Sequence, residues 1–238
     1  MAEGPGAAYP RQDLMVEPEW LAGHLDGPTL RIIDCDPPEV AMSRPHIPGA
    51  FLLPIHPYLK NTDTGQGVVT AAQLEAIMSG LGVGNDARVI CYDSQGSLLA
   101  ARVWWTLWYY GHGNVSVLNG GLPAWQALAL PVTSEWDSPK PTTFTATADV
   151  NRIAACDVIL PELDTGNLVP LDVRSELEWR GTPLQQVNAR EGHIPGAVHI
   201  EWREFVNWQD NGRFKPAVEI RELLERNGVT RDKRVVPY

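Results

Sequence analysis

The sequence has no apolar run of about 18 residues, the length a helix needs to cross a membrane. The segment from Met1 to Ala8 lacks the basic region and the apolar core of a secretory signal. Basic residues are also scarce, since 19 Lys and Arg stand against 29 Asp and Glu, for a net charge of −10. Binding a phosphate backbone needs a basic surface. We therefore expect a cytoplasmic protein with neither a nucleic acid nor a membrane as partner.

Cysteine is rare as well, and Cys35, Cys91 and Cys156 are its only occurrences. Their number is odd and no two form a CxxC pair, which argues against both a disulfide framework and a zinc site. Cys91 lies in the apolar run 89–92, where a thiol usually packs as a small hydrophobic group. We expect this buried, unreactive role for each cysteine. No glycine-rich phosphate motif or cluster of metal ligands stands out, so we expect no metal and no cofactor.

What the sequence does contain is an internal repeat. The pentapeptide HIPGA occurs at residues 46–50 and again at residues 193–197. Three further blocks match in the same order, namely 71–75 with 217–221, 82–86 with 228–232, and 88–92 with 234–238. A repeat unit this long is not a solenoid repeat, so it indicates a duplicated domain.

The duplication also predicts the domain boundaries. The stretch from Pro131 to Pro141 is rich in Pro, Ser, Thr and charge, as linkers are. We place a first domain at residues 12–133, a linker at 134–150 and a second domain at 151–238.

Short apolar strands alternate with helical patterns in each copy. In the first copy, strand-like segments at 29–34, 88–92 and 115–118 alternate with helical patterns at 70–82 and 98–110. Thr70 can cap the first of these helices. Alternation of this kind predicts an α/β fold, with a mainly parallel sheet flanked by helices in each domain.

Several motifs make the chain similar to the rhodanese superfamily, and specifically to its tandem two-domain sulfurtransferases. They are the HIPGA block in both copies, the segment 118–125 (LNGGLPAW) and the segment 172–181 (DVRSELEWRG). The resemblance covers nearly the whole chain. It implies two rhodanese-like domains and a thiosulfate or 3-mercaptopyruvate sulfurtransferase.

The resemblance also implies a mechanism. A cysteine lies in the loop after the central strand, where backbone N–H groups lower the pKa of its thiol. It takes sulfur from a small anionic donor as a persulfide and passes that sulfur to a thiol or cyanide acceptor. In the tandem enzymes the second domain carries this cysteine and the first does not.

The repeat locates the nucleophile position in both copies. In the first copy Asp93 follows Tyr92 at this position, and a carboxylate cannot accept sulfur and repels an anionic donor. In the second copy the position directly follows Tyr238, so no residue of the printed chain is assigned as catalytic. We expect this copy to be truncated just before its nucleophile, and the chain 1–238 alone to be inactive. The next residue in the complete protein is expected to be cysteine or selenocysteine, with a nonsense mutation as the alternative.

Arg180 is the candidate for binding the donor, because a guanidinium suits sulfonate and carboxylate oxygens. Arg190 is a weaker rival. Asp172 and Arg174 follow an apolar strand, and we expect them to support the active loop as an ion pair. His193 is expected to hydrogen-bond to local backbone rather than to act in catalysis.

The first copy is expected to repeat this support. His46 corresponds to the second HIPGA histidine and takes the same structural role. Asp34 ends the first strand and takes the role of the second copy's aspartate, although Asp36 replaces its arginine partner.

Two other functions stay open at this point. One is a non-catalytic rhodanese-like binding or regulatory module that lacks a nucleophile. The other is phosphatase or arsenate reductase chemistry, which some proteins of this fold perform with an active loop of different length. The tandem architecture favours sulfur transfer, and the residues after Tyr238 would separate the three.

Overall fold

The strands and helices of the computed structural model, which describes residues 9–60, 67–181 and 191–238, group into two units. The N-terminal unit comprises Pro10–Val150 together with Trp208–Phe214. The C-terminal unit comprises Asn151–Asn207 and Lys215–Tyr238, with Tyr9. The segment 208–214 thus groups with the N-terminal unit, although its sequence belongs to the second repeat. Within the described ranges, no helix has the length and apolar character needed to cross a membrane.

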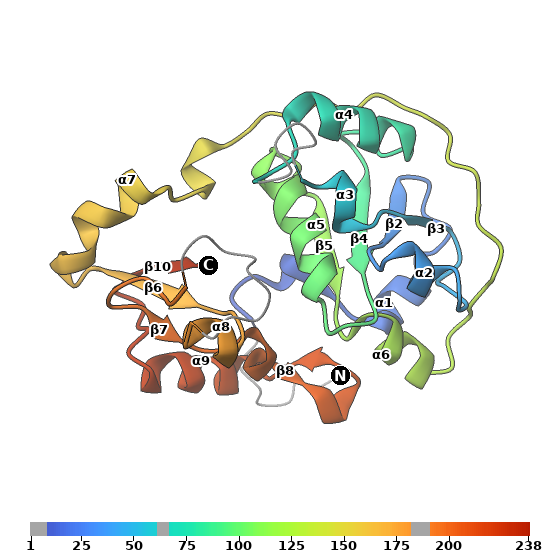
Figure 1. Cartoon of the computed structure of the whole chain (residues 1–238). Coiled ribbons are helices and arrows are strands. Elements are labelled where there is room, and N and C mark those ends of the chain that lie inside the picture. Colours follow the sequence, from blue (N-terminus) through green and yellow to red (C-terminus); the bar gives the residue numbers. More distant parts are fainter. Residues whose placement is uncertain (1–8, 61–66, 182–190) are drawn as a thin grey trace. The chain divides into compact units, whose positions relative to one another are not determined.

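A parallel five-stranded sheet of order β1-β5-β4-β2-β3 forms the centre of the N-terminal unit (Figure 1). Its strands are β1 (Met15–Val16), β2 (Leu30–Asp34), β3 (Ala50–Leu52), β4 (Arg88–Tyr92) and β5 (Val115–Leu118). Parallel neighbours need helical crossovers, and the chain supplies them between the strands. The predicted α/β fold with a parallel sheet is confirmed.

Helices cover both faces of this sheet. Successive side chains on a strand point to opposite faces, so Ile90 and Cys91 of β4 belong to different buried clusters. The helices on the Cys91 face are α4 (Ala71–Gly80) and α5 (Leu98–Tyr109), and those on the Ile90 face are α1 (Pro18–Ala22) and α6 (Gly121–Ala127). The shorter helices α2 (Pro38–Ala41) and α3 (Ile55–Tyr58) flank β3 in the sequence.

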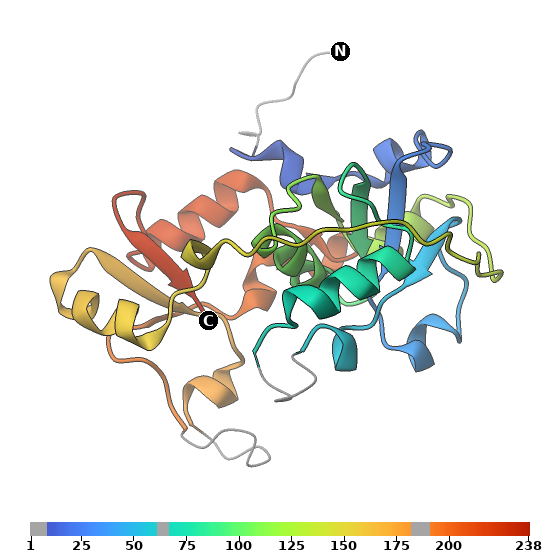
Figure 2. The same cartoon turned by 90° about the horizontal axis from the view of Figure 1, so that it is seen from above.

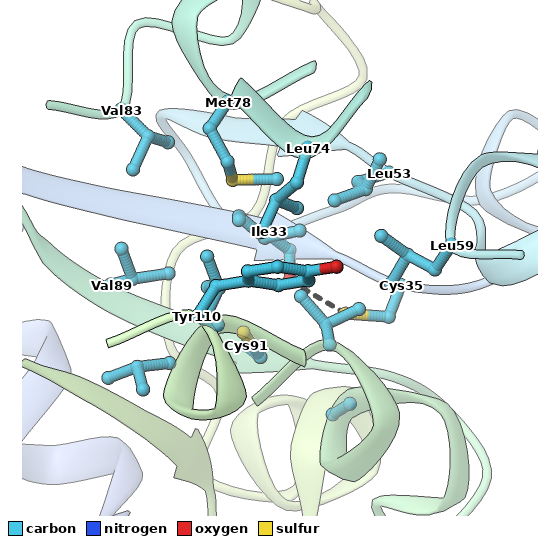
Figure 3. Packing of buried hydrophobic residues seen from close by; sticks show 14 of the residues in the cluster. Ile33, Cys35, Leu53, Leu59, Leu74, Met78, Val83, Val89, Cys91 and Tyr110 are labelled. Atoms are coloured by element: carbon cyan, nitrogen blue, oxygen red, sulfur yellow. Dashed lines mark hydrogen bonds between the residues drawn. The ribbon is translucent and has the colours of Figure 1, made fainter. Parts of the chain in front are cut away.

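The cluster beneath α4 and α5 contains two of the three cysteines (Figure 3). Cys35 and Cys91 are fully buried among aliphatic side chains, and burial raises the pKa of the Cys35 thiol well above its ordinary value. Both therefore have the expected inert role. The expectation is wrong for Cys156, which is exposed at the start of α7 (Cys156–Ile159).

Helix α4 begins where the sequence predicts. The Thr70 hydroxyl accepts the Gln73 N–H at 3.3 Å, and the Gln73 side chain accepts the Thr70 N–H at 3.1 Å, which makes a capping box. The segment after α6 runs extended beside this helix (Figure 2). There the Thr142 N–H donates to the Ser79 carbonyl at 3.0 Å. Much of the stretch expected as a linker therefore packs on the N-terminal unit.

The C-terminal unit has a parallel three-stranded sheet of order β10-β6-β7. The strands are β6 (Leu168–Asp172), β7 (Val198–His199) and β10 (Arg234–Pro237), and the further helices are α8 (Glu176–Trp179) and α9 (Ala217–Arg226). The C-terminal unit also contains β8 (Val206–Asn207), and the segment 208–214 of the N-terminal unit contains β9 (Arg213–Phe214). Short 3-10 turns are η1 (Gln12–Leu14), η2 (Val150–Arg152), η3 (Leu160–Thr165), η4 (Trp202–Phe205) and η5 (Trp208–Asp210).

The two repeats pair their strands in the same register. β2 lies between β3 and β4, and its counterpart β6 lies between β7 and β10. On one side, Leu30 pairs with Arg88, and the corresponding Leu168 pairs with Arg234. On the other side, Asp34 pairs with Leu52, and the corresponding Asp172 pairs with His199. The strands β4 and β10 therefore occupy equivalent places, with β4 ending at Tyr92 and β10 ending at Pro237, directly before the corresponding Tyr238.

The HIPGA blocks form the same turn in both repeats. The alanine N–H donates to the isoleucine carbonyl, at 3.1 Å in the first copy and 3.0 Å in the second. The glycine φ is 76° in the first copy and 75° in the second, a conformation that favours glycine. Proline before a glycine of positive φ is the signature of a type II turn. Each turn leads into the next strand, so the predicted duplication is confirmed.

Candidate active site

The loop after β4 holds the carboxylate of Asp93 among backbone N–H groups. Its Oδ1 accepts the N–H of Gln95 at 2.8 Å and of Ser97 at 2.9 Å. Its Oδ2 accepts the N–H of Leu99 at 2.7 Å and of Ala100 at 2.8 Å. Converging N–H groups of this kind make an anion site. We call these four donors the N–H cradle, and here the chain's own carboxylate fills it.

Local backbone conformation builds the cradle. Gly96 and Ser97 both have a φ of 71°, which turns the chain so that α5 starts directly beneath Asp93. The first N–H groups of a helix have no partner within it, and two of them point at the carboxylate. Burial raises the pKa of the Asp93 carboxyl, while the four N–H donors act in the opposite direction.

Two more buried carboxylates lie beside this loop and share one arginine. Arg44 Nη2 lies 2.5 Å from Asp36 Oδ2 and 3.1 Å from Asp34 Oδ2. The Gln95 side chain donates to Asp36 at 3.4 Å, which links the pair to the cradle loop. Burial raises the pKa of Asp34, and Arg44 and Tyr92 oppose that rise.

The expectation that Asp34 lacks an arginine partner is therefore corrected. Asp36 does occupy the position of Arg174 in the repeat, but Arg44 supplies the guanidinium from the segment before HIPGA. A buried carboxylate without a counter-charge is costly, and the arginine at a different position removes that cost.

Tyr92 fixes the start of the cradle loop. Its hydroxyl accepts the Ile47 N–H of the HIPGA turn at 3.3 Å. Its carbonyl accepts the Cys35 N–H at 2.9 Å. The residue is fully buried, so the position of Asp93 directly after it is tightly determined.

Trp208 closes the outside of the same loop. A Cβ added to Gly96 would lie 2.8 Å from Cη2 of the Trp208 ring, so only glycine allows this approach. Nearby, the Phe214 N–H donates to Asn119 Oδ1 at 2.9 Å and holds the segment 208–214 in place. The cradle is thus filled from within and covered from outside, and Asp93 has no exposed surface.

The C-terminal unit has the same framework at the end of β10. Arg174 contacts Asp172 through Nε at 3.0 Å and Nη2 at 2.5 Å, and donates to the Gly192 carbonyl at 2.9 Å. The Tyr238 hydroxyl accepts the Ile194 N–H at 3.0 Å. Burial opposes ionisation of Asp172, but the bonds from Arg174 and Tyr238 outweigh it and lower the pKa of that carboxyl.

The two HIPGA histidines each stack on a tryptophan. The ring of His193 lies 3.5 Å from that of Trp179, and its Nδ1 is 3.0 Å from the Trp179 carbonyl oxygen. The ring of His46 lies 3.7 Å from that of Trp136. The His193 ring therefore packs on Trp179 and contacts local backbone. The expectation that His46 has the same role is wrong, because both of its buried ring nitrogens lack a hydrogen-bond partner among the described residues and the ring is held by stacking.

The structure places the two arginine candidates differently. Arg180 follows α8, and 69% of its side-chain surface is exposed; its Nε lies 2.6 Å from Glu176 Oε1. The other candidate, Arg190, lies outside the described residues. Arg180 thus pairs with a carboxylate at the surface.

Comparison with known proteins agrees with this framework. The sequence matches the family described as "Rhodanese-like domain" over residues 17–128 and 157–238. The chain belongs to the rhodanese-like family.

Its relatives include sulfurtransferases. A putative thiosulfate sulfurtransferase of Haloferax volcanii is 32% identical over 95% of this chain and 82% of its own length. The sulfur carrier protein TtuD of Thermus thermophilus is 31% identical over 97% of this chain and 83% of its own length. The crystal structure of the 3-mercaptopyruvate sulfurtransferase SseA from Escherichia coli superposes with a TM-score of 0.81 at 27% identity, over 94% of this chain and 87% of that one.

Several residues of this rhodanese-like framework were missed in the sequence. The tyrosines at the ends of the two central strands were seen only as apolar strand residues. His199, which ends β7, lies 3.3 Å from Glu176 and 2.9 Å from the Arg174 carbonyl. The repeat could have identified the tyrosines, because both precede the nucleophile position. No sequence signal pointed to Arg44 or Trp208, since their partners come from other parts of the chain.

Proposed function

We propose that this chain is part of a sulfurtransferase that moves a sulfane sulfur from thiosulfate or 3-mercaptopyruvate to a thiol or cyanide acceptor. The N–H cradle around Asp93 carries the proposal, because it holds an anion directly after the central strand. The equivalent position in the second repeat directly follows Tyr238. A cysteine there would present its thiolate, and then its persulfide, to the same kind of cradle.

The proposed reaction has two displacements. The thiolate attacks the outer sulfur of thiosulfate, the bond between the two sulfurs of the donor breaks, and sulfite leaves with the bonding electrons. The enzyme then carries a persulfide. Cyanide or an acceptor thiolate attacks the terminal sulfur, which regenerates the thiolate and releases thiocyanate or an acceptor persulfide. With 3-mercaptopyruvate a carbon–sulfur bond breaks instead, and pyruvate leaves after taking up a proton.

Asp172, Arg174 and His193 have supporting roles in this proposal. The bonds from Arg174 to Asp172 and to the Gly192 carbonyl connect the end of β6 to the residue that directly precedes the HIPGA turn. Such supporting contacts hold reacting groups in place without touching the substrate. Arg180 is proposed to bind the donor's oxyanion, and its exposure leaves the guanidinium accessible.

The N-terminal unit has a different proposed role. Its cradle is occupied by Asp93 and covered by Trp208, so it offers no place for a donor anion. We assign this unit a structural, non-catalytic role. If the complete protein has no thiol after Tyr238, this role extends to the whole chain, as a rhodanese-like binding or regulatory module.

The test uses the full-length protein that contains this chain. Incubation with thiosulfate alone should add the mass of one sulfur atom, and cyanide should then remove it and release thiocyanate. The same protein with its post-Tyr238 cysteine changed to serine is the control, and it should do neither. A polypeptide of residues 1–238 alone should also be inactive. Full-length protein that forms neither the persulfide nor thiocyanate nor pyruvate would reject sulfur transfer and leave the non-catalytic module.

A further inference from the structure

Contacts from two segments, the end of β6 and the HIPGA turn, converge on Tyr238, which directly follows β10. Its hydroxyl accepts the Ile194 N–H at 3.0 Å. Its carbonyl accepts the Val173 N–H at 3.1 Å, and its own N–H donates to the Leu171 carbonyl at 3.0 Å. Both ends of the residue are therefore fixed.

We propose that Tyr238 is a positioning residue for sulfur transfer: its hydroxyl holds the HIPGA turn, its backbone holds the end of β6, and together these contacts fix where the nucleophile's loop begins. This inference rests on the proposed function, because it concerns the residue that follows Tyr238. The tyrosine touches neither donor nor acceptor in this role. It acts through the backbone that it holds.

The first repeat supplies the evidence that such an anchor aims the next side chain into the cradle. Tyr92 makes the matching contacts, since its hydroxyl accepts the Ile47 N–H and its carbonyl accepts the Cys35 N–H. The next residue, Asp93, then meets four N–H donors at 2.7 to 2.9 Å. Identical strand register and identical turns accompany this anchor in both repeats. The geometry that delivers Asp93 to its cradle therefore applies to the residue after Tyr238.

The second repeat adds one contact that the first lacks. The guanidinium carbon of Arg174 lies 5.2 Å from the centroid of the Tyr238 ring, within the range of a cation–π interaction. Arg174 also bonds to Asp172, so the tyrosine, the arginine and the aspartate form one connected group. We call them the strand-end triad. A shift in any member would move the start of the active loop.

Removing only the hydroxyl tests this role. In full-length protein, Tyr238→Phe leaves the ring and deletes the bond to Ile194. Tyr92→Phe is the matched control, because it deletes the same bond beside Asp93. Both variants should lose thermal stability. Only Tyr238→Phe should lower kcat, by about tenfold to a hundredfold, since small displacements of reacting groups cost rates of this order.

A second measurement does not depend on turnover. The rate of alkylation of the nucleophilic cysteine by iodoacetamide follows its thiolate fraction, so its pH midpoint reports how well the cradle stabilises the anion. Tyr238→Phe should shift this midpoint upward, and Tyr92→Phe should leave it unchanged. A merely structural role would lower stability in both variants without moving the midpoint. Replacement of Tyr238 by p-aminophenylalanine, which keeps a polar group at the ring's end, should restore both readouts in part.

The outcomes separate the two proposals. Wild-type protein that transfers sulfur, with Tyr238→Phe matching it in kcat and midpoint, overturns the positioning role and leaves the proposed function intact. Wild-type protein that transfers no sulfur, while Tyr238→Phe still shifts the midpoint, overturns the function and supports the positioning role. A residue other than cysteine or selenocysteine after Tyr238 overturns both.

Discussion

Arg44 and Asp36 form a 2.5 Å ion pair. At the two corresponding positions of the second repeat, the signs of the charges are reversed. Asp36 lies two residues after the aspartate that ends β2, and the same place after β6 holds Arg174. Arg44 lies two residues before the HIPGA histidine, and the same place in the second repeat holds Glu191. The aspartate at the strand end keeps an arginine partner in both copies. Both repeats therefore keep an Asp–Arg pair at the strand end, although the residues at positions 36 and 44 differ from those at the corresponding positions of the second repeat.

Loss of Arg44 should destabilise the N-terminal unit strongly. Arg44→Met leaves Asp34 and Asp36 buried without a counter-charge, and breaking such a buried pair costs about 3 kcal/mol of unfolding free energy. Urea unfolding monitored by tryptophan fluorescence measures this loss. Arg180→Met is the control, because its pair with Glu176 is largely exposed and such pairs contribute about 1 kcal/mol or less. Equal stability losses in both variants would contradict the structure at Arg44.

Asp172 should make the stability of the C-terminal unit depend on acid pH. Its pKa is lowered from the ordinary value of 3.8, so the folded state binds fewer protons than the unfolded state between the two values. Its stabilising contribution is complete above 3.8 and is lost as the pH falls through the lowered pKa. The stability difference between wild type and Asp172→Asn should therefore shrink as the pH drops below that range. Urea midpoints over a pH series measure this, and a constant difference would count against the ion pair with Arg174.

Two glycines with positive φ should respond very differently to alanine. Gly49, with a φ of 76°, has open space where a Cβ would lie, so Gly49→Ala costs only backbone strain of about 1–2 kcal/mol. At Gly121 the Cβ would lie 2.1 Å from the Asp93 carbonyl oxygen, which accepts the Leu122 N–H. Gly121→Ala adds this clash to the strain and should destabilise the protein further. Calorimetry compares the two, and a milder effect at Gly121 would disprove the close approach.

The sequence predicts the framework of this site better than its contacts. The α/β fold, the duplication, the Thr70 cap and the location of Asp93 all follow from local patterns and from the repeat. Arg44 and Trp208 do not, because their partners lie far away in the sequence and only the folded chain brings them together. Cys156 was misjudged because a short segment with few apolar residues gives little information about burial. Tyr92 and Tyr238 are intermediate in this respect, since the repeat predicts their positions but not their hydrogen bonds.

Arg180 should affect binding of the donor more than turnover. Arg180→Gln removes a charged donor for an oxyanion, a loss worth about tenfold in the KM for thiosulfate, with little change in kcat. Steady-state kinetics of the full-length protein measure both constants. Glu176→Gln is the companion variant, because it frees Arg180 from its surface pair and should leave KM equal or lower. An unchanged KM in Arg180→Gln would remove this residue from the proposed site.

The final prediction concerns the unused nucleophile position. Asp93→Cys places a thiol among the four N–H donors, which favour a thiolate, yet the position is fully buried and Trp208 covers the loop at Gly96. A donor dianion would also have to approach the buried Asp36 carboxylate. In full-length protein whose own nucleophile is serine, this variant should show at most marginal thiocyanate formation. It should also be less stable, because each N–H left without an oxygen acceptor costs about 1–3 kcal/mol. Rapid sulfur transfer by the folded variant would show that the loop opens to solvent and that Asp93 alone makes this copy inactive.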